Sequence, residues 1–250
     1  MANWNDPQRT RPGFGTTEGF TGASVPRTRE VFDAGLRSYM LSIYNYMTSG
    51  VLLTGVVALL TARSGLAVTF ASGPLMWLVA LSPLAIVFAM SFGANRFSTS
   101  TLRAMFWGFA VLMGLSLSTI FLVYTGSSIA ATFFATAGAF AGLSLFGYTT
   151  KKDLSAFGTF LIMGVVGLLI AMVVNMFLKS TGLDLAISFL GVLIFAGLTA
   201  WDTQRLKASY AQLRGTEFAG KMVVLGALSL YLDFINMFLF LLRFMGNSRN

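Results

Sequence analysis

The chain has 250 residues, of which 56% are hydrophobic and only 10% are charged. Soluble domains carry about 25% charged residues, so this composition excludes an ordinary soluble protein and predicts a membrane protein. Cysteine and histidine are both absent, which excludes disulfides, histidine-ligated metals and Ser–His or Cys–His catalytic pairs. Any proton or metal chemistry must therefore use the nine Asp and Glu side chains, hydroxyls, amides or backbone carbonyls.

The first 37 residues differ in composition from the rest of the chain. They contain nine of the 26 charged residues, together with Pro7, Pro12 and Pro26. This composition is typical of a disordered tail, and it lacks the apolar segment of a secretory signal. A glycine run at residues 13–19 has neither the spacing nor the preceding strand of a nucleotide-binding loop. We therefore predict a polar, disordered tail over residues 1–37.

Residues 38–250 alternate between long uncharged stretches and short polar ones. A helix needs about 20 apolar residues to cross roughly 30 Å of hydrocarbon. One uncharged stretch of 47 residues, 104–150, is too long for a single helix and is expected to break at the polar residues 124–128. The pattern predicts an all-α polytopic membrane protein with seven transmembrane helices. They are expected at about residues 38–62, 74–94, 104–125, 127–149, 154–178, 185–204 and 221–245.

Lysine and arginine residues predict the orientation. With the N-terminus in the cytoplasm, 13 of the 17 basic residues fall on inner segments and four on outer ones. Inner loops of membrane proteins are enriched in these residues, so the count favours this orientation and, with seven full spans, an external C-terminus. A re-entrant last segment would instead return the C-terminus to the inside. The same enrichment explains the net charge of +8 without a nucleic-acid partner.

Glycines recur within the predicted helices. Gly138 and Gly142 are four residues apart in the fourth helix, and the fifth contains Gly158, Gly164 and Gly167. Small residues at such spacings let helices approach closely in lipid. We expect them to serve tight packing within the bundle, with dimerisation through Gly138 and Gly142 as the alternative.

Two of the nine acidic residues lie at membrane depth. The other seven lie in the tail, in loops or, for Asp153, at a capping-box spacing after Thr150. Asp202 is at the inner end of the sixth predicted helix, and Asp233 is near the middle of the seventh. An ionisable group inside a membrane is unfavourable unless it is paired or solvated, and it is a functional candidate by default.

The two aspartates are predicted to lie close together. If the sixth helix continues through residue 213 and the chain turns at Gly215 and Thr216, Asp202 lies 13 residues before Gly215 and Asp233 lies 17 after Thr216. The difference of four residues corresponds to about 6 Å along an antiparallel hairpin. Two carboxylates this close cannot both ionise freely, so we expect a pair that titrates near neutral pH. Once deprotonated, the pair would also offer hard oxygen ligands to a divalent cation such as Ca²⁺.

Further polar residues are predicted to line a pocket around the aspartates. Ser229, Asp233 and Asn236 follow i, i+4 and i+7 spacing, which places them on one helix face. The structural alternative is that both aspartates are neutral and hydrogen-bonded to such groups, serving helix packing alone. The other amides that need partners are Asn45, Asn175 and Gln204.

Several motifs resemble those of bacterial members of the Bax inhibitor-1 family, over about residues 30–245. The most specific are Gly-Val-Leu-Ile-Phe at 191–195 leading to Trp-Asp-Thr-Gln at 201–204, and Leu-Ser-Leu-Tyr-Leu-Asp-Phe-Ile-Asn at 228–236. Weaker matches are Asp-x-Gly-Leu-Arg-x-Tyr-Met at 33–40, Tyr-Asn-Tyr-Met at 44–47 and Thr-Thr-Lys-Lys-Asp-Leu-Ser at 149–155.

The resemblance implies a seven-helix fold with the last helix at its centre, wrapped by three helix pairs. It also implies a pH-sensitive calcium leak, with Asp202 and Asp233 as the pH sensor and possible Ca²⁺ ligands in the pore. In some members an arginine that ends the second helix latches one aspartate, and Arg96 is the nearest candidate here. Arg243 matches a family arginine that pairs with a second-helix glutamate. Residues 82–84 are Ser-Pro-Leu in this chain, so that glutamate is missing.

Three functions are compatible with these features. The first is a pH-gated cation leak, which needs no cofactor and no enzymatic activity. The second is a non-transporting regulator that binds other membrane proteins through its tail, since some bacterial relatives modulate a quality-control protease. The third is an intramembrane aspartyl protease, which is disfavoured because its glycine-flanked aspartate and Pro-Ala-Leu motif are absent. Short loops and the lack of a targeting signal favour the bacterial inner membrane.

Overall fold

We use a computed structural model that describes the backbone of residues 24–248 and side chains from residue 30 onward. The chain divides into two compact units, residues 1–35 and 36–250, and the arrangement below is that of the second unit. Most of the predicted tail, residues 1–23, lies outside the described residues. The first helix begins at Ser24 rather than at residue 38, and Pro26 is compatible with its first turn.

The described residues form α-helices joined by short connections. Seven segments are long and apolar enough to cross a membrane, with α4 and α5 together forming the third of them. The all-α, seven-helix fold is therefore confirmed. The helices are α1 Ser24–Arg63, α2 Leu66–Phe70, α3 Leu75–Gly93, α4 Thr99–Leu117, α5 Ile120–Val123, α6 Gly126–Thr149, α7 Ser155–Leu178, α8 Thr181–Leu213 and α9 Phe218–Met245.

Helices α8 and α9 form the long hairpin on which the aspartates lie. Helix α8 continues to Leu213, as assumed when the distance between the aspartates was estimated, and so extends beyond the membrane span expected at residues 185–204; α9 begins at Phe218. Gly215 lies in the turn with a φ of 79°, a left-handed conformation that glycine adopts without a steric penalty. Helix α9 is unbroken over 28 residues, about 42 Å, which is enough to span a membrane.

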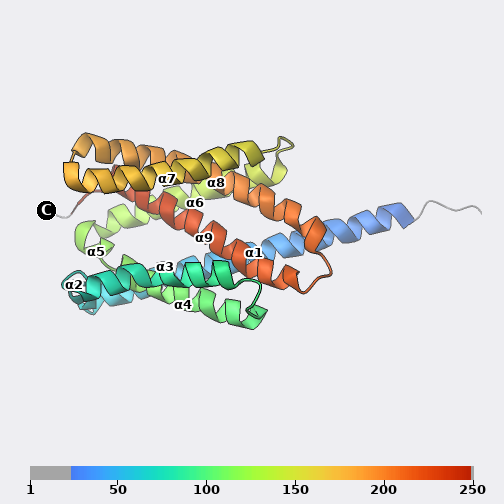
Figure 1. Ribbon diagram of the computed structural model, residues 1–250, viewed down its shortest axis with the longest axis horizontal. Helices are drawn as coiled ribbons and strands as arrows, with labels where there is room; N and C mark the ends of the chain where they lie inside the picture. Colours follow the sequence, from blue (N-terminus) through green and yellow to red (C-terminus); the bar gives the residue numbers. More distant parts are fainter. Residues whose placement is uncertain (1–23, 249–250) are drawn as a thin grey trace, which may run out of the picture. The chain divides into compact units, whose positions relative to one another are not determined.

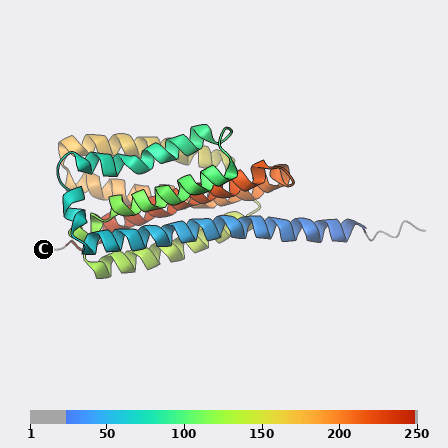
Figure 2. The same ribbon diagram turned by 90° about the horizontal axis from the view of Figure 1, so that it is seen from below.

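Helix α9 lies at the centre of the bundle. It runs obliquely between α6, α7 and α8 on one side and α1, α3 and α4 on the other (Figures 1 and 2). Its buried side chains include large apolar groups such as Tyr231, Met237 and Leu242. The hydroxyl of Tyr231 bonds to Thr54 Oγ1 at 2.7 Å, and the Thr54 hydroxyl also contacts the Ala110 carbonyl at 2.8 Å. These bonds tie α9 to α1 and α4.

Some glycines of α6 and α7 lie against a neighbouring helix, and others face away from the bundle. A Cβ atom on Gly147 would lie 2.1 Å from the Ala200 carbonyl oxygen, and one on Gly158 would lie 2.3 Å from the Trp201 ring. These glycines let α6 and α7 approach α8 closely. In contrast, a Cβ on Gly138 or Gly142 would meet nothing within 4 Å. The prediction that these two glycines pack the bundle internally is therefore wrong, because they face away from it. Gly167 faces outward in the same way, and Gly164 packs near Ile194.

Candidate functional site

Asp202 of α8 and Asp233 of α9 are brought together inside the bundle. Their relative exposures are 4% and 5%, and their carboxyl groups are near enough to interact electrostatically. The two residues lie on neighbouring helices of one hairpin. Because α8 extends to Leu213, Asp202 lies within the helix and not at its end. Two carboxyl groups are thus held side by side away from solvent.

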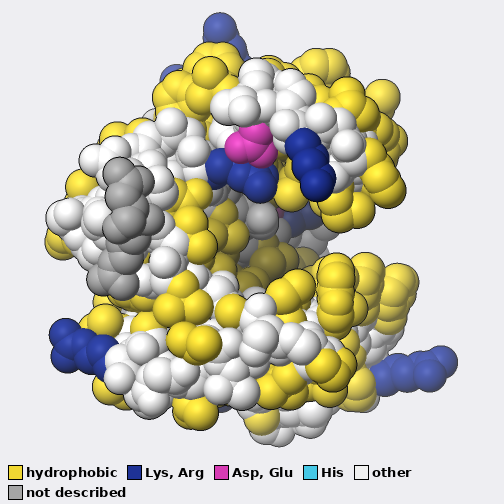
Figure 3. Space-filling model, turned by 90° about the vertical axis from the view of Figure 1, so that its left-hand side faces the viewer, with side chains coloured by type: hydrophobic (Ala, Val, Ile, Leu, Met, Phe, Trp, Pro, Cys, Tyr) yellow, Lys and Arg dark blue, Asp and Glu magenta, His cyan; other side chains and the backbone are white. Residues whose placement is uncertain are grey.

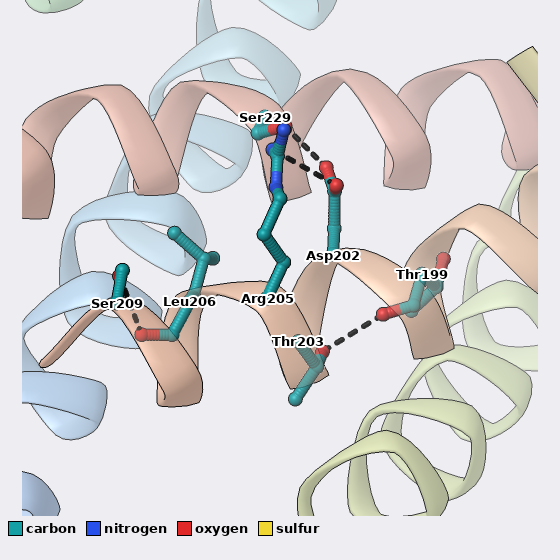
Figure 4. Close-up of polar contacts among 7 residues, drawn as sticks. All are labelled: Thr199, Asp202, Thr203, Arg205, Leu206, Ser209 and Ser229. Carbon is teal, nitrogen blue, oxygen red and sulfur yellow. Dashed lines mark hydrogen bonds and ion pairs between the residues drawn. The ribbon is translucent and has the colours of Figure 1, made fainter. Parts of the chain in front are cut away.

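Two side chains contact the Asp202 carboxylate directly (Figure 4). The Ser229 hydroxyl donates a hydrogen bond to Oδ2, and Arg205 Nη2 lies 2.9 Å from Oδ1. Arg205 also donates to Ser229 Oγ at 3.3 Å, and its guanidinium lies 4.7 Å from the centre of the Trp201 ring. Arg205 is therefore fixed by an anion, a hydroxyl and an aromatic face at once.

The two carboxyl groups lack donors for some of their oxygen atoms. Asp233 Oδ2 has no hydrogen-bond partner, and Arg205 is at ion-pair distance from Asp202 Oδ1 without hydrogen-bond alignment. A buried acceptor without a donor is destabilising by about 1–3 kcal/mol. A proton held between the two carboxyl groups would supply the missing donor. The arrangement is therefore suited to holding one proton.

A cavity of about 340 Å³ reaches this site from α3, α8 and α9. Its lining includes Arg205 and Ser229 together with apolar residues such as Val87 and Leu232. Neither aspartate lines it, so Arg205 and Ser229 lie between the cavity and the buried pair. Displacement of the Arg205 side chain would open the carboxylates to the cavity.

The oxygen ligands at the site are too few to enclose a metal ion. Among the described residues, no group of three or more acidic side chains that could hold a metal is present. Ca²⁺ takes about six to eight oxygen ligands, so water molecules would have to complete its shell. The Arg205 guanidinium also occupies the neighbourhood of the anionic oxygens and would repel a cation there.

Three of the residues predicted to line the pocket form hydrogen bonds with backbone groups away from the aspartates. The Gln204 side chain accepts from the Leu154 amide at 2.9 Å and donates to the Lys152 carbonyl at 2.7 Å. Asn175 Oδ1 accepts from the Ser180 amide at 3.0 Å, in the turn between α7 and α8. Asn236 donates to the Leu232 carbonyl of its own helix at 2.8 Å. Asn45 is exposed on α1, so of the predicted polar group only Ser229 contacts an aspartate.

The predicted latch, Arg96, does not contact either aspartate. It is exposed in the turn between α3 and α4, and neither of the two ion pairs among the described side chains includes it. The arginine that contacts Asp202 is Arg205 instead. Arg205 contributes to the inner basic residues that predict the orientation, but its position three residues after Asp202 also places it one helical turn away.

Arg243 pairs with Asp184, one of the acidic residues expected in loops. Its Nε atom lies 3.4 Å from Asp184 Oδ1, in the first turn of α8, and both side chains are partly exposed. The partner of Arg243 thus comes from the sixth span rather than the second.

Figure 3 shows the surface of the bundle at the end near α2 and α5. Acidic and basic side chains lie next to each other there, beside a hollow lined by hydrophobic side chains.

Asp153 forms a hydrogen bond with the backbone at the start of α7. Its Oδ1 atom accepts a hydrogen bond from the Ser155 amide at 2.9 Å. Hydrogen bonds from the Ser155 side chain and backbone lower the pKa of this exposed carboxyl group. The predicted capping box from Thr150 to Asp153 is not formed, because Thr150 is the C-cap residue of α6 and the residue before α7 is Leu154. Asp153 instead forms this local contact two residues before the Ser155 amide, outside the buried site.

Comparison with known proteins yields one family and several relatives. Residues 36–250 match the family model described as inhibitor of apoptosis-promoting Bax1. The chain is 46% identical over 220 residues to the inner membrane protein YbhL of Escherichia coli, covering 86% of this chain and 94% of the relative. It is 44% identical over 223 residues to a protein of Rickettsia prowazekii, covering 88% and 94%. A membrane protein of Streptococcus pyogenes is 34% identical over 220 residues, covering 86% and 95%.

Proposed function

The chain belongs to the Bax inhibitor-1 family, and from this premise we propose that it is a pH-sensitive leak channel for Ca²⁺ or another cation. Asp202 and Asp233 would form its proton-controlled gate. It is an integral, multi-pass membrane protein. We place it in a bacterial inner membrane, as the name of its Escherichia coli relative suggests, with the N-terminus in the cytoplasm.

The observation that carries the proposal is the charge balance of Asp202, Asp233 and Arg205. With one proton on the carboxyl pair, the pair carries one negative charge, which Arg205 at 2.9 Å balances. Loss of that proton leaves the three groups with a net negative charge, and the two carboxylates repel each other. Separation of the carboxylates and release of Arg205 toward the cavity would then create a cation-attracting path. Flux should rise as the pH rises through the titration of the pair.

The test is ion flux through the purified protein reconstituted into liposomes. We expect wild-type protein to pass Ca²⁺ to an entrapped indicator, with flux increasing from about pH 6 to about pH 8. Asp202→Asn and Asp233→Asn should each abolish the pH response, because neither variant can form the ionised pair. Asp184→Asn is the matched control, since it removes an exposed carboxylate from the same helix. Unchanged flux and unchanged pH response in both buried variants would refute the proposal.

A second candidate function is supported by the outward-facing glycines. Gly138 and Gly142 expose a small-residue face of α6 to the membrane, as needed for close contact with another helix. The protein would then be a regulator that binds membrane proteins, with its N-terminal residues as a further contact. Co-purification of a partner that persists in Asp202→Asn and Asp233→Asn, and is lost in Gly138→Leu, would favour this function.

We propose no enzymatic activity. The matching family is named for Bax inhibition and the YbhL relative for its membrane location, and neither name describes an enzyme. An aspartyl protease needs its two carboxyl groups free to activate water, whereas Arg205 and Ser229 engage Asp202. Failure to cleave model transmembrane substrates is the expected result.

A further inference from the structure

A second and larger cavity lies between α1 and α6. Its volume is about 710 Å³, and it is lined by one side of each helix, with Phe234 of α9 behind them. On α6 the lining residues recur every three or four positions from Phe133 to Tyr148. This spacing forms one continuous stripe along the helix, so the cavity is a groove parallel to the two helices.

The groove is apolar and opens toward the surroundings of the bundle. Leu41, Leu52 and Leu145 line it and are 49%, 58% and 63% exposed. In a protein with seven membrane spans, these side chains face hydrocarbon. Its lining runs along α1 from Arg37 to Leu52, a rise of about 22 Å, whereas one leaflet of hydrocarbon is about 15 Å thick. An acyl chain is therefore long and apolar enough to occupy it.

One end of the groove is basic. Arg37 lines this end, is exposed, and forms no ion pair or hydrogen bond among the described residues. Tyr148 lines the same end, and Lys207 lies behind it: its ammonium group is 4.7 Å from the ring centre and bonds to the Tyr148 carbonyl at 2.7 Å. A guanidinium without a partner beside an apolar groove fits a phosphate group attached to an acyl chain.

We propose that this groove is a binding site for an anionic phospholipid. The lipid phosphate would pair with Arg37, and an acyl chain would lie between α1 and α6 against Phe140 and Phe234. Charge complementarity selects a lipid over an apolar helix of a partner protein, because such a helix would leave Arg37 without a counter-charge. The site is separate from the buried aspartates and does not depend on the proposed leak.

A hydrogen-bonded chain connects the wall of the groove to α8. The Tyr44 hydroxyl, from α1, bonds to Ser144 Oγ of α6. Ser144 Oγ lies 3.0 Å from Thr203 Oγ1, which in turn bonds to the Thr199 carbonyl at 2.8 Å (Figure 4). Thr203 directly follows Asp202 in α8. A bound lipid would thus contact a wall that is hydrogen-bonded to the helix carrying one of the two aspartates.

Native mass spectrometry of the full chain in detergent tests the lipid site. Phosphatidylglycerol and phosphatidylcholine with identical oleoyl chains are added in equal amounts, and the lipid retained on the protein is counted. Wild-type protein should retain phosphatidylglycerol about tenfold better than phosphatidylcholine, because only the former has a net negative headgroup. Arg37→Gln should remove this preference. Arg96→Gln, an exposed arginine outside the groove, should keep it.

Filling the groove separates a groove-bound lipid from one bound elsewhere. Ala137→Phe places a ring in the groove and should abolish retention, whereas Ala135→Phe, on an exposed face of α6 outside the lining, should not. Equal retention of the two lipids by wild-type protein, or an equal loss in Arg37→Gln and Arg96→Gln, would overturn the proposal. A second chain or a partner protein held in place of lipid, and released by Ala137→Phe, would overturn it as well.

Discussion

Helix α8 carries the aspartates of two aspartate–arginine pairs that differ in their exposure to solvent. In the pair at its start, Asp184 and Arg243 have side-chain exposures of 37% and 42%. In the pair deeper in the bundle, Asp202 is 6% exposed and only Arg205 reaches outward, at 51%. An exposed pair is screened by water and salt, whereas a buried carboxylate depends strongly on each partner that it retains. The same two residue types therefore form a surface ion pair in one place and an ion pair with a buried carboxylate in the other.

The largest difference between the two pairs should appear when their arginines are removed. Arg205→Gln deletes the positive charge that favours ionisation of Asp202, so the pH midpoint of Ca²⁺ flux should rise by about one unit or more. Liposome flux measured across a pH series gives this midpoint. Arg243→Gln should leave it unchanged. Equal midpoints in wild-type protein and Arg205→Gln would show that Arg205 does not act on the pair.

A smaller effect should follow the loss of the Ser229 hydroxyl. Ser229→Ala removes a donor from Asp202 Oδ2, and an unsatisfied buried acceptor lowers the free energy of unfolding by about 1–3 kcal/mol. Thermal unfolding in detergent measures the change. Ser188→Ala is the control, because the Ser188 hydroxyl bonds to the Asp184 carbonyl within α8 and its loss leaves no buried charge. A smaller decrease in the free energy of unfolding for Ser229→Ala than for Ser188→Ala would contradict the expected dependence of Asp202 on the Ser229 hydroxyl.

The smallest effect should come from the exposed pair. Asp184→Asn should change the free energy of unfolding by about 0.5 kcal/mol or less at low salt, and by less still at high salt. A double-mutant cycle with Arg243→Gln, repeated at two salt concentrations, measures the coupling. A large, salt-independent coupling energy would mean that this pair is protected from solvent and that the two pairs are alike after all.

The positions of the seven spans could be predicted because charge is so unfavourable in hydrocarbon. Uncharged stretches between the basic residues gave helix limits close to those observed for α3, α6 and α7. The limits of α1 and α8 were less accurate, since both helices continue into polar sequence where hydropathy gives no boundary. The short helix α2, Leu66–Phe70, was not predicted because five residues carry too little periodic pattern.

Within the site, the two aspartates could be predicted by elimination and their partners could not. Gln204 is two residues from Asp202, which rotates it about 200° around α8 and turns it toward the loop before α7. Asn175 is near the end of α7, opposite the start of α8, and so lies about 30 Å along the axis from Asp202. Arg205 was predictable from its i+3 spacing, but a count of inner basic residues had already assigned it another role.

The close approach of α6 to α8 determines which parts of the bundle can move. At Gly147 the obstacle is the Ala200 carbonyl, a backbone atom that cannot rotate away. At Gly226 of α9 the nearest atom is the end of the Leu206 side chain, which can adopt another rotamer. Sliding between α6 and α8 at this point is therefore blocked by main chain, whereas at Gly226 a flexible side chain separates α8 from α9. Helices α6 and α8 would shift as a single rigid body, and α9 would be the element that turns against it.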